Sequence, residues 1–406
     1  MKRRTFSRLA LGSLGAAPLG AAPMAASGRK RVAGVVTEYT WYSHADVVLG
    51  RILGGNSANN VHSEPRTHLV SLYRDQKPKN DMAPDMAARF GFTLYPTIHD
   101  ALTLGGGKLA VDAVILIGEH GNYPRNELGQ QMYPRYELFN QILDVYEKSG
   151  RAVPTFSDKH FSYSWEKASK MYDRARRLRV PFMAGSSIPV SVRTPLLEIP
   201  LNAPLEHAVA LGYGPPDAYG FHLLESLQCM VERRAGGETG IESVEWLEGD
   251  AIWKWIAGEG AWSKPLIDEA ARRNPSRKPV PVEEEARKPV LFLLNYRDGF
   301  RAAAMIITPS GARWSFACRR KGESRIDSTL FGLAAPGRPL PHFDGLVKCI
   351  EDMFVSGKPV YPVERTLLTT GALAFLFQSK GHGRRVETPE LSVRYQAPEH
   401  AYFQKS

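Results

Sequence analysis

The first half of the chain alternates between two hydrophobic patterns. Short uninterrupted apolar runs, typical of strands buried on both faces, are followed by stretches whose apolar residues recur every three or four positions. The pattern predicts strands over residues 31–36, 68–73, 93–95, 111–117, 153–156 and 181–184, and helices over residues 43–53, 82–90, 97–105, 135–148 and 164–178. Strands and helices in this order predict a parallel sheet with helices on both faces, a Rossmann-like α/β domain.

The pattern changes near Ile188. The segment "SIPVSVRTPLLEIPLNAPLE" is proline-rich and extended, and one amphipathic helix over residues 218–234 follows it. Strands are then predicted in succession over residues 241–247, 251–256, 290–296, 302–308, 313–319 and 324–331, and helices over 344–356 and 363–380 close the chain. Grouped strands predict an α+β domain with an open antiparallel sheet. We therefore divide the chain into a Rossmann-like domain, 28–187, and an α+β domain, 188–406.

Residues 1–27 have the layout of a cleaved export signal. A basic start, a weakly apolar stretch and a small-residue end follow one another in "KRRTFSRLALGSLGAAPLGAAPMAAS". Arg3 and Arg4, with Phe6 two places on, match the twin-arginine pattern, so we expect export of the folded protein to the periplasm. The internal apolar runs beyond the signal are under ten residues long, which is too short to span a bilayer.

Charge and cysteine content narrow the function. The signal carries four basic residues and no acidic one, so its removal lowers the formal charge from +10 to +6. The remaining basic residues are spread among acidic ones, which argues against a nucleic-acid surface. Three widely spaced cysteines, Cys229, Cys318 and Cys349, fit neither a disulfide framework nor a zinc site and are most simply core residues.

Polar side chains follow the strands of the predicted parallel sheet. Because the carboxyl ends of parallel strands meet at one edge, where such sheets bind ligands, we expect these loops to converge. The loops contain Thr37, Glu38 and Tyr39; Gly118, Glu119 and His120; and Asp158, Lys159 and His160. His222 and Glu225 stand three positions apart and share a face of the helix over residues 218–234.

A lysine, histidines and carboxylates in one crevice can supply a general acid and a general base. Each residue also has a purely structural interpretation. Glu119 and His120 could cap a helix, Lys159 could be a solvated lysine, and His222 could be a core histidine bonded to a carbonyl.

The order of these segments resembles the glucose–fructose oxidoreductase, inositol dehydrogenase and MocA-type (Gfo/Idh/MocA) oxidoreductases over residues 30–385. The similar stretches are "FGFTLYPTIHDALTLGGGKLAVDAVILIGEH", "SGRAVPTFSDKHFSYSWEKASKMYDRARRLRVPFMAG", "YGFHLLESLQCM" and the C-terminal "HFDGLVKCIEDMFVSGKPVYPVERTLLTTGALAFLFQSKGHGRRV". The resemblance implies a dinucleotide-binding domain followed by a substrate domain with an open antiparallel sheet. That sheet would pack against a second copy in a homo-oligomer.

The resemblance also implies roles for individual residues. The lysine of the family's "EKP" segment, which assists proton transfer at the reacting carbon, falls on Lys159, with Asp158 and His160 in place of the flanking Glu and Pro. The family's catalytic histidine falls on His222, and the acid that would orient it falls on Glu225.

The resemblance implies NAD or NADP as the cofactor. The predicted cofactor contacts are Thr37, Glu38, Tyr39, Asp75, Gly118, Glu119 and His120. The largest departure from the family lies here, because its glycine fingerprint would follow Val36, where residues 37–42 read Thr-Glu-Tyr-Thr-Trp-Tyr. Side chains of this size should keep a pyrophosphate from the backbone, and Glu38 would repel it. Asp75, after the second predicted strand, falls on the family's ribose-binding acid.

Three hypotheses follow from the sequence. The first is an exported oxidoreductase that acts on a sugar or cyclitol hydroxyl with NAD(P). The second keeps the scaffold for a non-redox lyase, hydratase or hydrolase acting on a carbohydrate, with or without a metal, although no spacing in the sequence specifies one. The third is a binding protein without catalysis, whose charged crevice would be filled by its own ion pairs.

Overall fold

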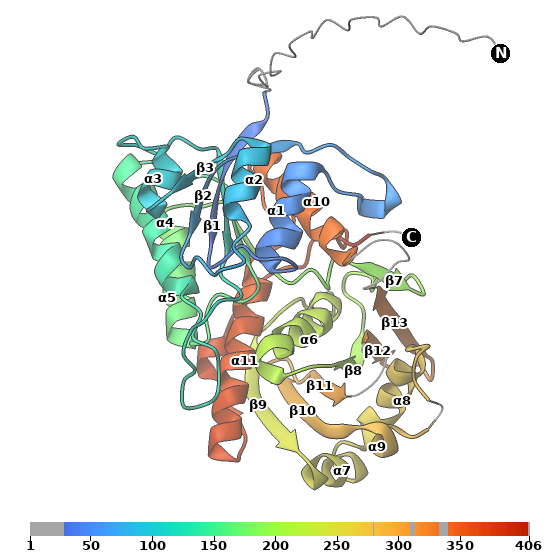
Figure 1. Ribbon diagram of the computed structural model, residues 1–406. Coiled ribbons are helices and arrows are strands. Elements are labelled where there is room, and N and C mark those ends of the chain that lie inside the picture. The colour runs from blue at the N-terminus through green and yellow to red at the C-terminus, as the bar shows by residue number, and fades with distance from the viewer. Residues whose placement is uncertain (1–27, 279, 309–312, 333–339, 405–406) are drawn as a thin grey trace, which may run out of the picture.

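The computed structural model describes residues 28–278, 280–308, 313–332 and 340–404. The predicted export signal, residues 1–27, lies outside the described residues. The described chain forms two domains, each built on one sheet (Figure 1).

The first domain is a parallel sheet of six strands in the order β3-β2-β1-β4-β5-β6. The strands are β1 (Lys30–Val36), β2 (Thr67–Arg74), β3 (Thr93–Tyr95), β4 (Ala113–Ile117), β5 (Thr155–Asp158) and β6 (Phe182–Gly185). The helices are α1 (His44–Gly54), α2 (Ala83–Phe90), α3 (Ile98–Thr103), α4 (Arg135–Ser149) and α5 (Trp165–Arg177). The Rossmann-like prediction is confirmed. In this strand order the direction of winding reverses between β1 and β4, and ligands of such folds bind at the carboxyl edge there.

The sequence determines these elements locally. All five residues of β4, Ala113–Ile117, are buried, as a central parallel strand requires. Ser43, Thr97 and Ser164 stand before helices α1, α3 and α5, and each side chain accepts a hydrogen bond from a first-turn backbone N–H. Gly91 and Gly150 end α2 and α4 in the left-handed conformation that glycine adopts without strain.

The second domain is an eight-stranded sheet in the order β14-β9-β10-β11-β8-β12-β13-β7. Its strands are β7 (Val192–Thr194), β8 (Leu205–Gly212), β9 (Ile241–Glu248), β10 (Arg287–Tyr296), β11 (Arg301–Thr308), β12 (Trp314–Arg320), β13 (Ile326–Gly332) and β14 (Val386–Glu387). The sheet is mostly antiparallel, but β11 and β8 pair in parallel, so it is mixed. The prediction of a strand over residues 251–256 is wrong, because these residues lie in the helix α7 (Asp250–Ala257).

Helices cover both faces of this second sheet. The helices α6 (Pro216–Val231) and α11 (Glu364–His382) pack on one face, while α7 and α8 (Lys264–Arg272) pack on the other. The short elements η1 (Ala58–Asn60), η2 (Ala261–Ser263), α9 (Val282–Glu285) and η3 (Pro389–Leu391) complete the described chain. The helices α7 and α8 cover apolar residues of the second face, and packing of the sheet against a second copy stays a prediction.

The helix α10 (His342–Ser356) returns from the second half of the chain to the first domain. It lies beside α1, and Phe343, Leu346 and Ile350 belong to the same core as residues of β1 and β2 (Figure 1). Glu351 accepts hydrogen bonds from the backbone N–H of Thr67, at 3.1 Å, and from its hydroxyl, at 2.9 Å. The helix α10 therefore completes the core of the first domain, although the division at residue 187 assigned it to the second domain.

The three cysteines are buried free thiols, and burial raises the pKa of each. None of the helices within the described ranges combines the length and the apolar character that a membrane crossing requires.

Candidate active site

A cleft of about 550 Å³ lies where the carboxyl edge of the parallel sheet faces α6 and β12. Both domains contribute to its walls. The lining includes Tyr42, His44, Glu119, His120, Tyr133, Lys159, Tyr219, His222, Arg313, Trp314 and His342. A cavity of this size holds a small polar ligand, and its aromatic and titratable walls are typical of a binding or catalytic site.

A buried ion-pair cluster forms the floor of the cleft. The Lys159 Nζ atom lies 2.7 Å from Glu119 Oε1, and the other Glu119 oxygen pairs with the guanidinium of Arg135. Burial alone would raise the pKa of Glu119, but the charges of Lys159 and Arg135 outweigh it and hold that pKa well below its usual value. Glu119 is therefore a carboxylate at neutral pH and fixes the ammonium of Lys159 at the cleft wall.

The backbone is strained at this floor. His120 and Lys159 have φ angles of 70° and 60°, a left-handed conformation that side-chain-bearing residues adopt rarely. Gly118 is required beside them, because a Cβ atom there would lie 2.6 Å from Arg135 Cγ. Burial lowers the pKa of His120 to about 4, so the ring is neutral at physiological pH. Its buried Nε2 atom has no hydrogen-bond partner among the described residues.

His222 lies on α6, at the opposite wall, and Ser186 holds it. The distance from Ser186 Oγ to His222 Nδ1 is 2.6 Å, and the same oxygen accepts a hydrogen bond from the Ile188 N–H at 3.0 Å. Ser186 therefore occupies the Nδ1 side of the imidazole and leaves Nε2 as the nitrogen available to a ligand. Burial, with the nearby charges of Lys159 and His44, lowers the pKa of His222 well below its usual value. His222 thus lines the cleft as a neutral imidazole.

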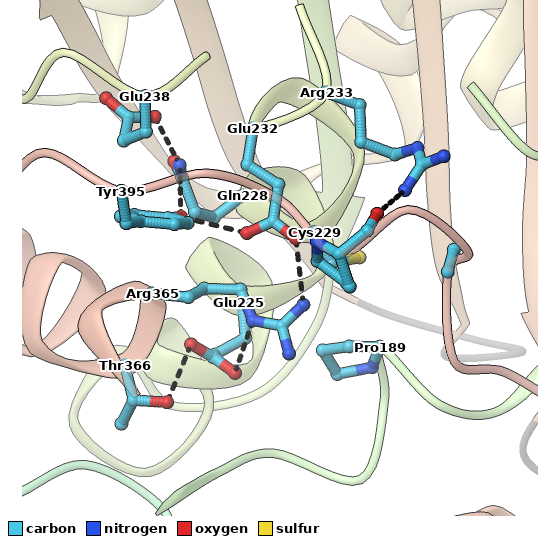
Figure 2. Close-up of polar contacts among 12 residues, drawn as sticks. Pro189, Glu225, Gln228, Cys229, Glu232, Arg233, Glu238, Arg365, Thr366 and Tyr395 are labelled. Atoms are coloured by element: carbon cyan, nitrogen blue, oxygen red, sulfur yellow. Dashed lines mark hydrogen bonds and ion pairs between the residues drawn. The ribbon is translucent and has the colours of Figure 1, made fainter. Parts of the chain in front are cut away.

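The prediction that Glu225 orients His222 is wrong, because Ser186 and not Glu225 contacts His222 Nδ1. Its carboxylate accepts hydrogen bonds from the Thr369 hydroxyl, at 2.8 Å, and from the Ser186 N–H, at 3.4 Å. It also pairs with Arg365, whose guanidinium bonds Glu232 on its other side (Figure 2). Burial raises the pKa of Glu225. Glu225 therefore supports His222 only indirectly, through Ser186.

The network around Glu225 continues away from the cleft between α6 and α11. Figure 2 shows Glu232 bonded to Tyr395, Tyr395 to Gln228, and Gln228 to Glu238. Three carboxylates are buried in this network, and hydrogen bonds or cations satisfy each of them. The network holds α6, and with it His222, rigidly against the end of the first sheet.

Asp158 and His160, which flank Lys159 in the "EKP"-like segment, lie in different surroundings. Asp158 is buried and bonds His44, with 2.6 Å between Asp158 Oδ2 and His44 Nδ1. His160 is buried behind the ion-pair cluster, 3.3 Å from Arg135 and 5.3 Å from the ring of Phe221, and is not among the described residues that line the cleft. Burial lowers the pKa of His160 well below its usual value.

Sequence reasoning missed His44. It is the first residue of α1, it lines the cleft, and it reaches across the edge of the sheet to the end of β5. Its position at the start of the helix that follows β1 was the available signal, because that position faces the ligand-binding edge.

The turn between β1 and α1 does not fit a pyrophosphate. No glycine occurs between Val36 and α1, and Tyr39 is fully buried, with its carbonyl accepting the Met82 N–H at 2.8 Å. At the start of α1, Ser43 Oγ accepts the N–H of Asp46, whose carboxylate adds negative charge where an anion would bind.

The neighbouring position for a cofactor ribose is also occupied. Asp75 accepts hydrogen bonds from the phenols of Tyr73, at 3.0 Å, and Tyr123, at 2.7 Å. Gln76 and Asn122 exchange two hydrogen bonds, so the loops after β2 and β4 are joined across the end of β1. Thr37 also bonds the Glu119 carbonyl across this edge, at 2.7 Å. The residues of the turn and of the ribose position therefore do not fit a dinucleotide bound in the expected way.

Comparisons with known proteins support the fold. No family model and no curated protein matches the sequence. Among solved structures, GenD2 from gentamicin A biosynthesis, in complex with NAD, is 13% identical with a TM-score of 0.55, covering 92% of this chain and 99% of GenD2.

Two further similar structures are myo-inositol dehydrogenases. The Lactobacillus plantarum enzyme, myo-inositol 2-dehydrogenase, is 10% identical with a TM-score of 0.52, covering 88% of this chain and 99% of its own. The Corynebacterium glutamicum enzyme is 9% identical with a TM-score of 0.53, covering 88% and 98%. The chain thus has the two-domain fold of these oxidoreductases over nearly its whole length, at an identity that establishes the fold alone.

Within the described ranges, no three His, Cys, Asp or Glu side chains are grouped so that they could hold a metal ion.

Proposed function

We propose that this protein is an enzyme on the Gfo/Idh/MocA-type scaffold that moves protons at a hydroxyl-bearing carbon of a sugar or cyclitol. The observation that carries the proposal is the cleft, in which the Lys159–Glu119 pair from the first domain faces His222 from the second. An ammonium, a neutral imidazole and aromatic walls suit a polyhydroxylated ring, since they offer both hydrogen bonds and apolar contact.

Two forms of this chemistry share the cleft. The first is an NAD(P)-dependent oxidoreductase. It is supported by the fold shared with GenD2, which was solved with NAD, and with the inositol dehydrogenases. The second is a non-redox lyase, hydratase or hydrolase, in which the residues of the cleft act without a dinucleotide. The occupied turn and the Asp75–Tyr123 bond favour this second form.

One experiment separates the two forms. The protein is purified folded from the cytoplasm and denatured, and the supernatant is analysed for NAD(H) and NADP(H), with a second sample titrated with each nucleotide. Stoichiometric release or binding supports the oxidoreductase. No release and no binding on titration support the non-redox form. A panel of sugars and cyclitols then tests turnover, and failure of every member to react or bind would refute the proposal as a whole.

Export to the periplasm through the twin-arginine route is part of the proposal and rests on Arg3 and Arg4. Replacement of both by lysine should leave the uncleaved protein in the cytoplasm, as measured by cell fractionation. Unchanged export of that variant would contradict the twin-arginine route.

A further inference from the structure

We infer that His44 is the proton acceptor of this cleft and that Asp158 positions it. The inference rests on the proposed function, because it names a base for the proton transfer proposed there. The two residues come from different elements, the start of α1 and the end of β5, and they meet across the carboxyl edge of the sheet.

The hydrogen bond between these residues determines which nitrogen faces the ligand. The distance from His44 Nδ1 to Asp158 Oδ2 is 2.6 Å, and the side chain of Asp158 is 2% exposed. A carboxylate oxygen accepts a hydrogen bond, so the imidazole proton lies on Nδ1 and the lone pair on Nε2. Among the described residues, Nε2 of His44 has no hydrogen-bond partner, and the side chain, 16% exposed, lines the cleft.

Packing holds the ring in this orientation. The ring of Phe343, on α10, meets the His44 ring edge-on with 5.1 Å between centroids, and the ring of His120 lies 5.4 Å away. With Asp158 at one end and Phe343 against the ring, His44 cannot rotate without breaking the buried hydrogen bond. This arrangement, an imidazole oriented by a buried carboxylate, is the one that makes histidine an efficient base.

The opposite wall complements this base. The Ser186 contact occupies Nδ1 of His222, so Nε2 is the nitrogen of each histidine that remains for a ligand. The two rings line the same cleft. A substrate hydroxyl can therefore donate to His44 while a second hydroxyl of the same ring bonds His222.

The step assigned to His44 is a single proton transfer. The O–H bond of a substrate hydroxyl breaks, the N–H bond at Nε2 forms, and the electron pair stays on the substrate oxygen. The imidazolium that results is stabilised by the carboxylate of Asp158. The step is common to both forms of the proposed function, and it needs no group beyond the side chains and the substrate.

Modification by diethyl pyrocarbonate tests the geometry without a known substrate. The reagent acylates unprotonated imidazole nitrogens, and peptide mass spectrometry reports the rate at each histidine of the full-length folded protein. We expect His44 to react at least as fast as His62, whose side chain is 59% exposed, although His44 is mostly covered. Slower reaction of His44 than of the buried His222 would overturn the inference.

Asp158→Asn tests the role of the carboxylate. The carboxylate can only accept, which keeps the proton on Nδ1, whereas an amide can also donate to Nδ1 and so move the proton to Nε2; the variant should therefore slow modification of His44 several-fold and leave His62 unchanged. Asp100→Asn is the matched control, because Asp100 lies 3.4 Å from the exposed His99, and it should not affect His44. Circular dichroism checks that both variants fold. An unchanged rate at His44 in folded Asp158→Asn would overturn the positioning role.

His44→Asn tests catalysis on any sugar or cyclitol that the panel identifies. The amide can keep a hydrogen bond to Asp158 but cannot accept the proton, so kcat should fall by about 10²–10⁴ while KM changes little. Retained kcat would refute His44 as the base and leave the proposed function standing. If no panel member reacts but His44 shows the predicted reactivity, the proposed function fails and the activated imidazole stands.

Discussion

The clearest perturbation of the cleft floor is Glu119→Gln, which removes one charge from between two buried cations. The side chains of Glu119, Lys159 and Arg135 are 7%, 6% and 1% exposed, so solvent cannot replace the lost charge. Removing one partner of a buried pair typically costs about 3–5 kcal/mol, and we expect a loss of that size in the free energy of unfolding at pH 7. Urea denaturation followed by circular dichroism measures it.

The pH dependence of this loss follows from the pKa of Glu119. Lys159 and Arg135 hold that pKa below its value in the unfolded chain, so the carboxylate stabilises the fold above about pH 4.3. This contribution disappears as the pH falls through the folded-state pKa. The difference between the wild type and Glu119→Gln should therefore be constant from pH 6 to pH 7 and shrink below pH 4.

The surface pair Glu137–Lys167 provides a matched control. These side chains are 46% and 30% exposed, so Glu137→Gln should cost no more than about 1 kcal/mol. A loss for Glu119→Gln as small as that of the control, or a loss that does not change with pH, would refute the reasoning from burial.

Two further substitutions test the support of the cleft, both measured by urea denaturation. Arg365→Met leaves Glu225 and Glu232 without their shared cation and should lower the free energy of unfolding by about 3–5 kcal/mol at pH 7. Because burial already raises the pKa of both carboxyls, they become protonated near pH 5 and the loss should be smaller there. A larger loss at pH 5 than at pH 7 would contradict this account. Gly185→Ala places a Cβ atom 2.8 Å from Glu225 Oε2 at a φ of 134° and should lower the free energy of unfolding by about 1–3 kcal/mol. The control is Gly50→Ala, which has open space inside α1 and should raise the free energy of unfolding by about 0.5–1 kcal/mol. Equal effects of the two substitutions would show that the contact at Gly185 carries no strain.

The sequence predicted the first domain well because its strands are unambiguous. A strand such as β4, with every residue buried and apolar, has few alternative interpretations. The segment "AIWKWI" was misread because it is rich in Ile and Trp, which favour strands. Gly249, with a φ of 57°, instead ends β9, and α7 starts at Asp250. The strand β8 was missed because it follows a proline-rich segment that reads as irregular.

The sequence predicted which edge of the parallel sheet holds the candidate site, but not which side chains bond each other there. Topology identifies which loops meet, so Glu119, Lys159 and His222 were found from the order of the strands and the resemblance. It does not say which side chains bond each other across that edge. Asp158 and His44 stand 114 positions apart, and nothing in either local segment marks the other as its partner. For the same reason Ser186, which holds His222, was not found.

The return of α10 to the first domain bears on how the protein is made. Residues 28–187 emerge from the ribosome without Phe343, Leu346 and Ile350, which fill part of their core. Protein synthesis proceeds at about 5–20 residues per second, so α10 emerges on the order of ten seconds after residue 187. During that interval the nascent sheet exposes apolar surface, which makes it a substrate for chaperones. The first domain is complete only after most of the second has been synthesised, so the two halves of the cleft reach their final form together.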